Sequence, residues 1–134
     1  MASGNVELVR SIYAAWERGD YSSTDWADPA IEAVSADGPV TGSSKGLAGM
    51  ADLTRDFLSA WEEYRTEADE YRELDSERVL VLSRFLARGK RSGLELGQIQ
   101  TKGAALFHIR NCKVIKVVRY WDRERAFADL GLKE

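Results

Sequence analysis

The sequence has few of the side chains that metal sites and disulfides require. Its 134 residues include one histidine, His108, and one cysteine, Cys112. Structural zinc sites take four Cys or His ligands, catalytic zinc sites usually take two or three histidines, and each disulfide takes two cysteines. The composition therefore excludes both kinds of zinc site and a disulfide framework, and no metal is expected. The lone thiol is typical of a reducing, cytoplasmic compartment.

Long apolar runs are absent as well. No stretch approaches the roughly 18 consecutive apolar residues that a membrane-spanning helix needs. The sequence begins Met-Ala-Ser-Gly-Asn, which lacks the basic and apolar regions of a signal peptide. We therefore expect a cytoplasmic protein with no membrane partner.

Charge is divided unevenly along the chain. Residues 1–77 hold 6 basic and 17 acidic side chains, residues 78–134 hold 13 basic and 5 acidic ones, and the net charge is −3. Such asymmetry can indicate a nucleic-acid-binding half. Here the basic residues alternate with apolar ones, as in Leu82–Arg88, and do not cluster. We interpret them as a solvated sheet surface and expect no nucleic-acid partner.

Apolar side chains recur at helical spacing in two long segments. Asn5 is the expected N-cap of the first helix and Gly19 its expected end. Asp122 and Gly131 are the corresponding residues of a short terminal helix. The predicted helices are residues 6–18, a short turn or helix at residues 23–27, residues 47–61 and residues 123–130.

The remaining apolar segments alternate with polar residues and predict strands, of which the acidic segment 64–74 fits a sheet edge. The predicted strands are residues 30–36, 64–74, 79–88, 94–110 and 113–121. Their connections are a loop at 37–46, a hairpin at 89–93 and a two-residue turn at Asn111–Cys112, with a bulge at Gly97 or Gly103. The order predicts one α+β domain over residues 1–134. It is a cone-shaped, curved, mostly antiparallel sheet wrapped around about three N-terminal helices, with a short C-terminal helix.

Four segments carry a resemblance that spans nearly the whole chain. They are Val9–Asp20, Asp28–Glu32, Ser44–Leu47 and Val118–Leu132. In their order and spacing they resemble the nuclear transport factor 2-like superfamily, in particular its SnoaL-like and ketosteroid isomerase-like branch. The resemblance implies a cone-shaped domain with an apolar pocket inside, usually paired as a homodimer through the outer face of its sheet.

The steroid isomerase mechanism needs a tyrosine on the first helix, an aspartate base on the first strand and a protonated aspartic acid on the fourth. The tyrosine position aligns with Ile12, beside Tyr13. The base position falls at Val34, or at Ser35 after a one-residue shift, and the second acid falls at Ala105. Neither carboxylate is present, so this mechanism is not expected.

Two other reactions of the superfamily also depend on carboxylates. Its epoxide hydrolases use an Asp-Arg-Asp arrangement on the sheet, and this sequence has no Asp between Leu80 and Trp121. Its SnoaL-like cyclases use one acidic pocket residue as acid and base. The candidate for that role here is Glu32.

Strand alternation predicts which side chains point into the cone. Glu32 and Arg119 are expected there as catalytic residues, because burial tunes proton affinity, with Tyr13 as a hydrogen-bond donor. The expected ligand-binding residues are Trp16, Trp26, Phe57, Trp61, Ser83, Phe85, Phe107 and Trp121. The alternatives are a structural ion pair, a Glu32 turned to solvent, and aromatic side chains that only form the core.

The same alternation assigns a second set of side chains to the outer face. They are Leu80, Leu82, Arg84, Leu86, Leu106, His108, Lys116, Val118 and Tyr120. This face is too apolar for contact with water, so we expect a homodimer to cover it. His108 lies outside the pocket in this scheme, and Cys112 at a turn lacks a nearby base.

These observations predict a cytoplasmic protein whose conical pocket binds a small, largely apolar molecule. It is a candidate cofactor-independent acid–base enzyme of the isomerase, cyclase or lyase type. No cofactor is expected, since the loop Gly42–Gly46 lacks the phosphate-loop pattern and no nucleotide fingerprint occurs elsewhere. The alternative is a ligand-binding or protein-interaction domain without catalysis. Convergence of Glu32 and Arg119 inside the pocket would favour the enzyme.

Overall fold

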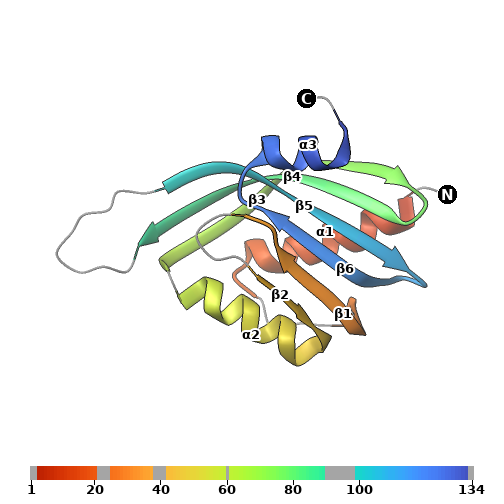
Figure 1. Ribbon diagram of the computed structural model, residues 1–134, viewed down its shortest axis with the longest axis horizontal. Coiled ribbons are helices and arrows are strands. Elements are labelled where there is room, and N and C mark those ends of the chain that lie inside the picture. The colour runs from red at the N-terminus through yellow and green to blue at the C-terminus, as the bar shows by residue number, and fades with distance from the viewer. Residues whose placement is uncertain (1–2, 21–24, 38–41, 60, 90–98, 133–134) are drawn as a thin grey trace.

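The computed structural model describes residues 3–20, 25–37, 42–59, 61–89 and 99–132 (Figure 1). Side chains are described for these residues except 3, 56–59, 61–64, 87–89 and 99–101. The elements in chain order are α1 (Ser3–Glu17), β1 (Ala27–Ser35), β2 (Gly42–Lys45), α2 (Gly46–Ser59), β3 (Trp61–Asp75), β4 (Arg78–Gly89), β5 (Ile99–Arg110), β6 (Lys113–Tyr120) and α3 (Arg123–Leu130).

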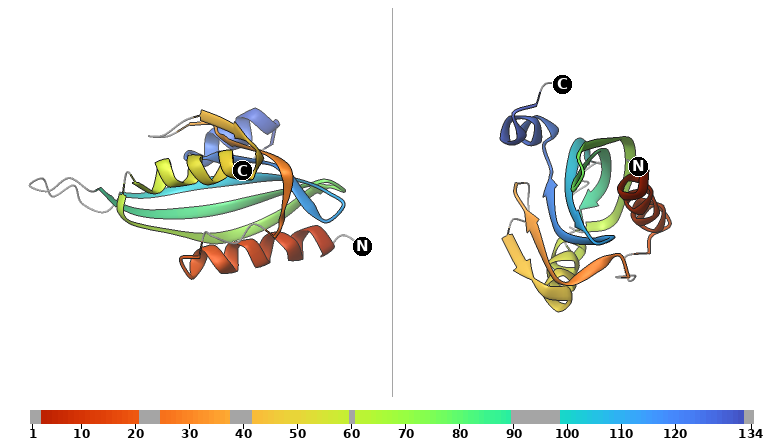
Figure 2. Two further views of the ribbon diagram at one scale, coloured as in Figure 1. Left: turned by 90° about the horizontal axis from the view of Figure 1, so that it is seen from below. Right: turned by 90° about the vertical axis from the view of Figure 1, so that its right-hand side faces the viewer.

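The strands form one curved sheet in the order β2-β1-β6-β5-β4-β3. Every neighbouring pair is antiparallel except β1 and β6, which run parallel. The acidic strand β3 lies at an edge, as its composition predicts. Helices α1 and α3 lie on opposite sides of the sheet (Figure 2). The predicted α+β fold with a curved, mostly antiparallel sheet is confirmed.

The inner face of the sheet, defined here as the face that packs against α1, forms the larger apolar core. The predicted helical stripe of α1 is buried there through Val9, Ile12, Tyr13 and Trp16. Met50 of α2 joins the same cluster. The strands contribute Ala27, Ile31, Ala33, Val79, Val81, Ala105, Phe107, Ile109, Val114 and Val117.

The outer face carries a second apolar cluster, which the chain's own C-terminal helix covers. Ala126 and Phe127 of α3 pack against the strands there. The buried strand residues are Leu80, Leu82, Ala104, Leu106, Val118 and Tyr120. The homodimer was predicted on the premise that a second copy covers this face. That premise is wrong for the residues beneath α3, and a homodimer stays a prediction without this support.

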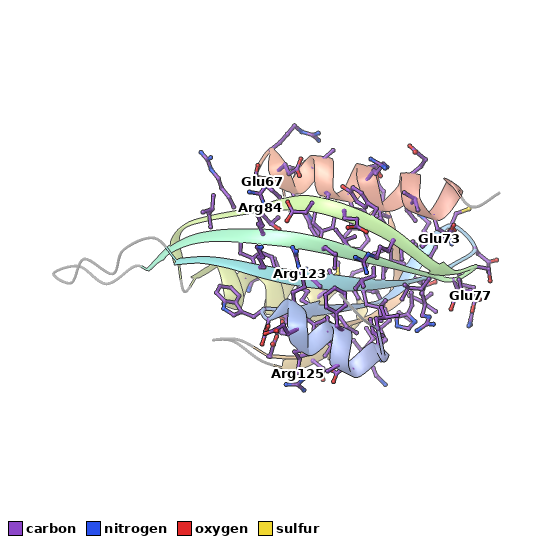
Figure 3. All side chains as sticks on the ribbon, turned by 90° about the horizontal axis from the view of Figure 1, so that it is seen from above. Glu67, Glu73, Glu77, Arg84, Arg123 and Arg125 are labelled. Atoms are coloured by element: carbon purple, nitrogen blue, oxygen red, sulfur yellow. The ribbon has the colours of Figure 1, made fainter. Side chains whose placement is uncertain are left out.

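Helix α3 is held to the sheet by Arg123, whose side chain reaches from the helix over the strands (Figure 3). Its Nη2 donates to the carbonyl oxygen of Ser83 at 2.7 Å, and its Nε donates to that of Gly103 at 3.1 Å. The same guanidinium pairs with Asp69 at 3.1 Å, and Asp69 also accepts from Arg84 at 2.7 Å. Although burial alone would raise the pKa of Asp69, hydrogen bonds from Arg123 and Arg84 hold it below its usual value.

Several predicted element ends are confirmed by backbone geometry. Asp122 accepts a hydrogen bond from the amide of Glu124, and Gly131 ends α3 in the left-handed conformation. Gly19 closes α1 with a positive φ of 83°. Asn111 and Cys112 both have positive φ values, 53° and 63°, as a two-residue hairpin turn requires.

Other predictions at the N-terminal half are corrected. Asn5 is not the N-cap, because α1 begins at Ser3 and the Asn5 side chain donates to the carbonyl oxygen of Ser76 at 2.9 Å. The predicted loop 37–46 contains β2, and Trp61 begins a strand instead of ending a helix. Two N-terminal helices are described, since residues 25–26 form a turn and residues 21–24 lie outside the described residues.

The predicted hairpin at 89–93 and the start of the strand predicted at 94–110 fall on residues 90–98, outside the described part of the chain. The strand is described from Ile99 onward. Of the two glycines proposed for a bulge, Gly97 also lies outside the described residues, and Gly103 lies within β5.

Replacement of Gly103 by alanine is expected to lower the free energy of unfolding by about 2 kcal/mol or more. A Cβ at this position would lie 2.2 Å from Cε2 of Phe85 and 2.5 Å from the carbonyl oxygen of Tyr120, which cannot move aside. Denaturant unfolding measures the change. Gly4→Ala is the matched control, because a Cβ there meets nothing within 4 Å, and it should leave stability unchanged or slightly higher. Equal stability of the two variants would contradict the assigned packing.

Candidate functional site

The register of the sheet aligns side chains in rows across the inner face. One row runs through five strands and consists of Tyr71, Val81, Ala105, Arg119 and Ser35. The next row contains Ala68, Ser83 and Gly103. Side chains of paired residues lie on the same face of a sheet. Arg119 and Ser83 therefore occupy adjoining rows of the inner face, as alternation predicts for both.

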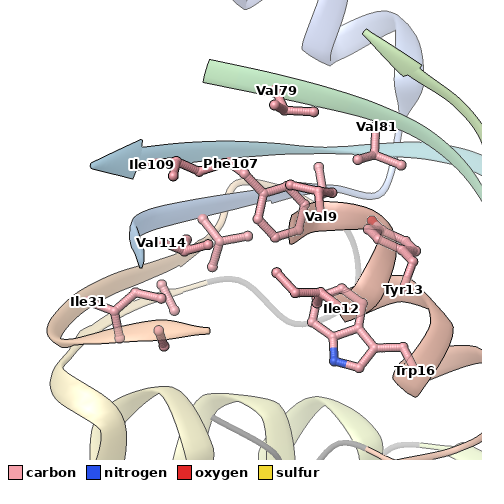
Figure 4. Packing of buried hydrophobic residues seen from close by; sticks show 14 of the residues in the cluster. Val9, Ile12, Tyr13, Trp16, Ile31, Val79, Val81, Phe107, Ile109 and Val114 are labelled. Atoms are coloured by element: carbon pink, nitrogen blue, oxygen red, sulfur yellow. The ribbon is translucent and has the colours of Figure 1, made fainter. Parts of the chain in front are cut away.

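One half of the inner face is packed entirely with apolar side chains. Val9 and Ile12 of α1 lie against Val79, Phe107 and Val114 of the strands, as Figure 4 shows. All five are fully or almost fully buried. Phe107, which the sequence assigned to ligand binding, is fully buried in this packing and is described as a core residue.

The other half of the inner face brings polar groups and aromatic rings together. Tyr13 is almost fully buried. Its ring makes edge-on contacts with Trp16 at 4.9 Å and with Tyr71 at 6.1 Å between centroids. The half-buried Arg119 places its guanidinium carbon 5.5 Å from the centroid of the Trp16 ring, a cation–π geometry. We define the inner-face site as Tyr13, Trp16, Thr66, Ser83, Phe85, Arg119 and Trp121.

Two hydroxyl groups of this site are buried without a hydrogen-bond partner among the described residues. They are Oγ of Ser83, a residue with 0% exposure, and Oγ1 of Thr66, a residue with 4%. Thr66 pairs with Phe85, two residues beyond Ser83 on β4, so the two hydroxyl groups are diagonal neighbours on one face. Most buried polar atoms in proteins are hydrogen-bonded, and an unpartnered one marks a place where water or a ligand can bind.

Burial raises the pKa of Tyr13. Removal from water raises the pKa of its hydroxyl well above the ordinary value, and the positive charge of Arg119 only partly opposes this effect. The interaction with Ser83 also favours the ionised form, although Ser83 Oγ does not meet the geometry of a hydrogen bond. Tyr13 is therefore a neutral hydrogen-bond donor at neutral pH, beside a guanidinium that is always charged.

Four aromatic rings surround the polar half. Phe85 and Trp121 stack with centroids 5.4 Å apart and planes 19° apart. Trp16 and Trp26 meet edge-on at 6.1 Å. The carboxylate of Asp37 fixes the backbone at Trp121 by accepting from its amide at 2.6 Å. Trp26, Trp121 and Arg119 all remain partly exposed.

The predicted inward orientation of Glu32 is wrong. Its neighbours Ile31 and Ala33 point into the core. Glu32 is aligned with Lys45 and Lys116 of the adjacent strands, on the opposite face of the sheet. The alternation of residues 30–36 is weak, and the pairing of β1 with β6 is irregular between Ala27 and Glu32. Glu32 and Arg119 therefore lie on different faces of the sheet and do not converge. Catalysis by Glu32 at the inner face has no geometric support.

Two positions on the first strand were aligned with the aspartate base of steroid isomerases. Ser35 lies on the inner face, in the row of Arg119 and Ala105, whereas Val34 contacts the outer cluster.

Thr66 was not predicted from the sequence as a site residue. Thr66 belongs to β3, a strand rich in exposed acidic residues, so the sequence gives no sign that its hydroxyl is buried. The pairing of Thr66 with Phe85 shows that it lies on the inner face.

The other residues considered from sequence lie apart from the inner-face site. His108 is half-buried on the outer side of β5, as predicted. Burial and the nearby charges of Lys116 and Arg78 lower its pKa. Cys112 is exposed at its turn. The side chains of Phe57 and Trp61 lie outside those that the structure describes.

Within the described ranges, no group of three or more His, Cys, Asp or Glu side chains has an arrangement that could hold a metal ion. The helices over these ranges include none that is long and apolar enough to cross a membrane.

No protein-family model matches the sequence, and no curated protein matches it. Solved structures share its fold. A nuclear transport factor 2-like protein of unknown function from Burkholderia pseudomallei is 20% identical, with a TM-score of 0.77 over 94% of this chain and 96% of that one. TerC, co-crystallised with polyporic acid, is 20% identical, with a TM-score of 0.76 over 96% and 98% of the two chains.

A third structure, from a species of Jannaschia, is provisionally assigned as a SnoaL-like polyketide cyclase. It is 12% identical, with a TM-score of 0.72 over 99% of this chain and 95% of that one. At these identities the likeness establishes the fold. The chain has the nuclear transport factor 2-like fold, which the SnoaL-like structure shares.

Replacement of Tyr13 by phenylalanine should remove a loss of stability at alkaline pH. Because the folded state raises the pKa of Tyr13 above the unfolded value of about 10, its contribution to stability is complete below pH about 10. It falls as the pH rises toward the folded-state pKa. Denaturant unfolding from neutral pH to about pH 11 should show a steeper decline for the native chain than for Tyr13→Phe. Tyr71 and Tyr120 are present in both proteins, so their contributions to the pH dependence cancel in the comparison. Parallel pH profiles would contradict the burial of this hydroxyl.

Proposed function

We propose that the protein binds a small, largely apolar and planar molecule at the inner-face site, between α1 and strands β3 to β6. The observation that carries this proposal is the pair of buried, unpartnered hydroxyl groups of Ser83 and Thr66. Leaving such groups unpaired costs the free protein about 1–3 kcal/mol each. A ligand oxygen or nitrogen that accepts or donates there would recover part of that cost on binding.

The surroundings of these hydroxyl groups set the shape of the ligand. Phe85 and Trp121 form a stacked pair, and the Trp16 ring lies beside the guanidinium of Arg119. Aromatic walls with a few fixed polar groups are typical of small-molecule sites. Support also comes from the fold neighbours, one co-crystallised with polyporic acid and one provisionally assigned as a polyketide cyclase.

The remaining candidates for acid–base catalysis at this site are Tyr13 and Arg119. A neutral hydroxyl donor and a guanidinium can both stabilise negative charge on a carbonyl oxygen. Neither removes a proton from a substrate at neutral pH, and Glu32 is on the other face. Binding is therefore the function that we propose, and the catalytic roles of Tyr13 and Arg119 stay predictions.

A thermal-shift screen of planar aromatic compounds tests the proposal, because binding to the native state raises the apparent stability. For a compound that binds, Ser83→Ala should weaken affinity by about 3- to 10-fold, the effect of one neutral hydrogen bond. The same variant should be as stable as the native chain or more stable by about 1 kcal/mol, because it removes a buried, unpartnered oxygen.

Ser11→Ala is the matched control. Ser11 is exposed on α1 and its hydroxyl donates to the carbonyl oxygen of Leu8, so its replacement should leave affinity unchanged. Two results would count against the proposal: an absence of stabilising compounds, or full affinity in both Ser83→Ala and Thr66→Val.

A further inference from the structure

We infer that the ligand of the inner-face site is an organic anion, whose acidic oxygen is bound between the guanidinium of Arg119 and the hydroxyl of Tyr13. The inference rests on the proposed function and adds the charge of the ligand to it. Its basis is the difference between Arg119 and the other half-buried arginines in their carboxylate partners.

Half-buried arginines elsewhere in the described residues each have a carboxylate partner. Arg72 pairs with Glu70 at 2.6 Å, Arg78 with Asp75 at 2.7 Å, and Arg123 with Asp69 at 3.1 Å. These pairs follow the rule that a charge taken partly out of water is compensated by an opposite charge or by hydrogen bonds.

Arg119 departs from this rule. It is half-buried, yet it forms no ion pair with any acidic residue that the structure describes, and its guanidinium faces the ring of Trp16. Its cross-strand neighbours on either side are Ala105 and Ser35, which are small and uncharged. The sheet thus presents a cation on its inner face, with small neighbours beside it and no internal counter-charge among the described residues.

Tyr13 supplies a second donor for the same oxygen. It lies near enough to Arg119 for their charges to interact, and it stacks edge-on with the Trp16 ring that Arg119 covers. Guanidinium and hydroxyl donors together favour an oxygen that carries negative charge, such as a carboxylate or an enolate. The aromatic pair Phe85–Trp121 then requires that this oxygen be attached to an apolar, planar body instead of belonging to an inorganic ion.

The acidic group that acts on Tyr13 is compatible with this assignment. Glu17 interacts electrostatically with Tyr13, but its side chain is exposed and its Oε2 accepts from the amide of Ala68 at 3.2 Å. A carboxylate in contact with water is screened, so it repels a bound anion only weakly.

Matched pairs of aryl carboxylates and carboxamides test the inference: benzoate, 2-naphthoate and anthracene-2-carboxylate, each with its neutral amide. Members of a pair share size and shape and differ in charge. At neutral pH the native chain should bind at least one carboxylate about tenfold or more tightly than its amide, measured by calorimetry. In Arg119→Gln this preference should fall to about threefold or less, and Arg119→Lys should retain part of it.

Arg125→Gln is the control variant, because Arg125 lies exposed on the solvent side of α3 (Figure 3) and its loss should leave the preference intact. Denaturant unfolding of each variant verifies that it is folded. Equal affinity for acids and amides would overturn the inference while leaving the proposed function in place. A full preference in Arg119→Gln would exclude Arg119 as the anion-binding group. Binding of no member of either series would contradict both proposals.

Discussion

The central constraint on this fold is a sheet that is apolar on both faces and must therefore be covered on both. Along β4, Val79 and Val81 point to α1, and the intervening Leu80 and Leu82 point to α3. A face left in water would forfeit roughly 25 cal/mol for each Å² of apolar surface. Helix α3 is short, so its packing is reinforced by the bonds of Arg123 to two strand carbonyls. Those carbonyls belong to Ser83 and Gly103, which also form a row of the inner face, so the outer helix fixes the backbone beneath the inner-face site.

The inner face itself is divided along the direction of its strands. At one end, Phe107 and the valines and isoleucines around it are packed as in any core. At the other end lie the unpartnered hydroxyl groups of Ser83 and Thr66 and the half-buried cation of Arg119. Sequences depart from optimal packing chiefly where function requires it. Gly103 belongs to the same end, because only a residue without a Cβ admits the Phe85 ring against the sheet.

Much of the fold is predictable from the sequence because its signals are local. The stripe of α1, the caps of α3 and the period-two pattern of β4 each depend on residues close in sequence, and alternation assigns Ser83 and Arg119 to the correct face. Predictions failed where the deciding contact is remote. Glu32 was wrongly assigned to the inner face. The orientation of β1 is set by its parallel pairing with β6, and no local pattern reveals that pairing.

The same limitation explains why the outer face was expected to be a dimer interface. Its apolar pattern was identified correctly, but a pattern does not say what covers it, and the chain's own α3 covers the buried cluster there. Asn5 is likewise of a residue type that favours helix N-caps, but its side chain bonds to Ser76, 71 residues away. Long-range partners of this kind are set by the tertiary structure alone.

Likeness at about one-fifth identity establishes the fold and leaves the chemistry of the interior to individual residues. The chemistry here is set by a cation and neutral donors: Arg119, Tyr13 and the Ser83 hydroxyl. Such a set stabilises negative charge that a ligand already carries or develops. It does not generate that charge, because generation requires a base, and Glu32, the carboxylate that the sequence suggested, faces the other side of the sheet. These groups therefore favour the proposed role, the binding of an acidic molecule, over the deprotonation of a neutral one.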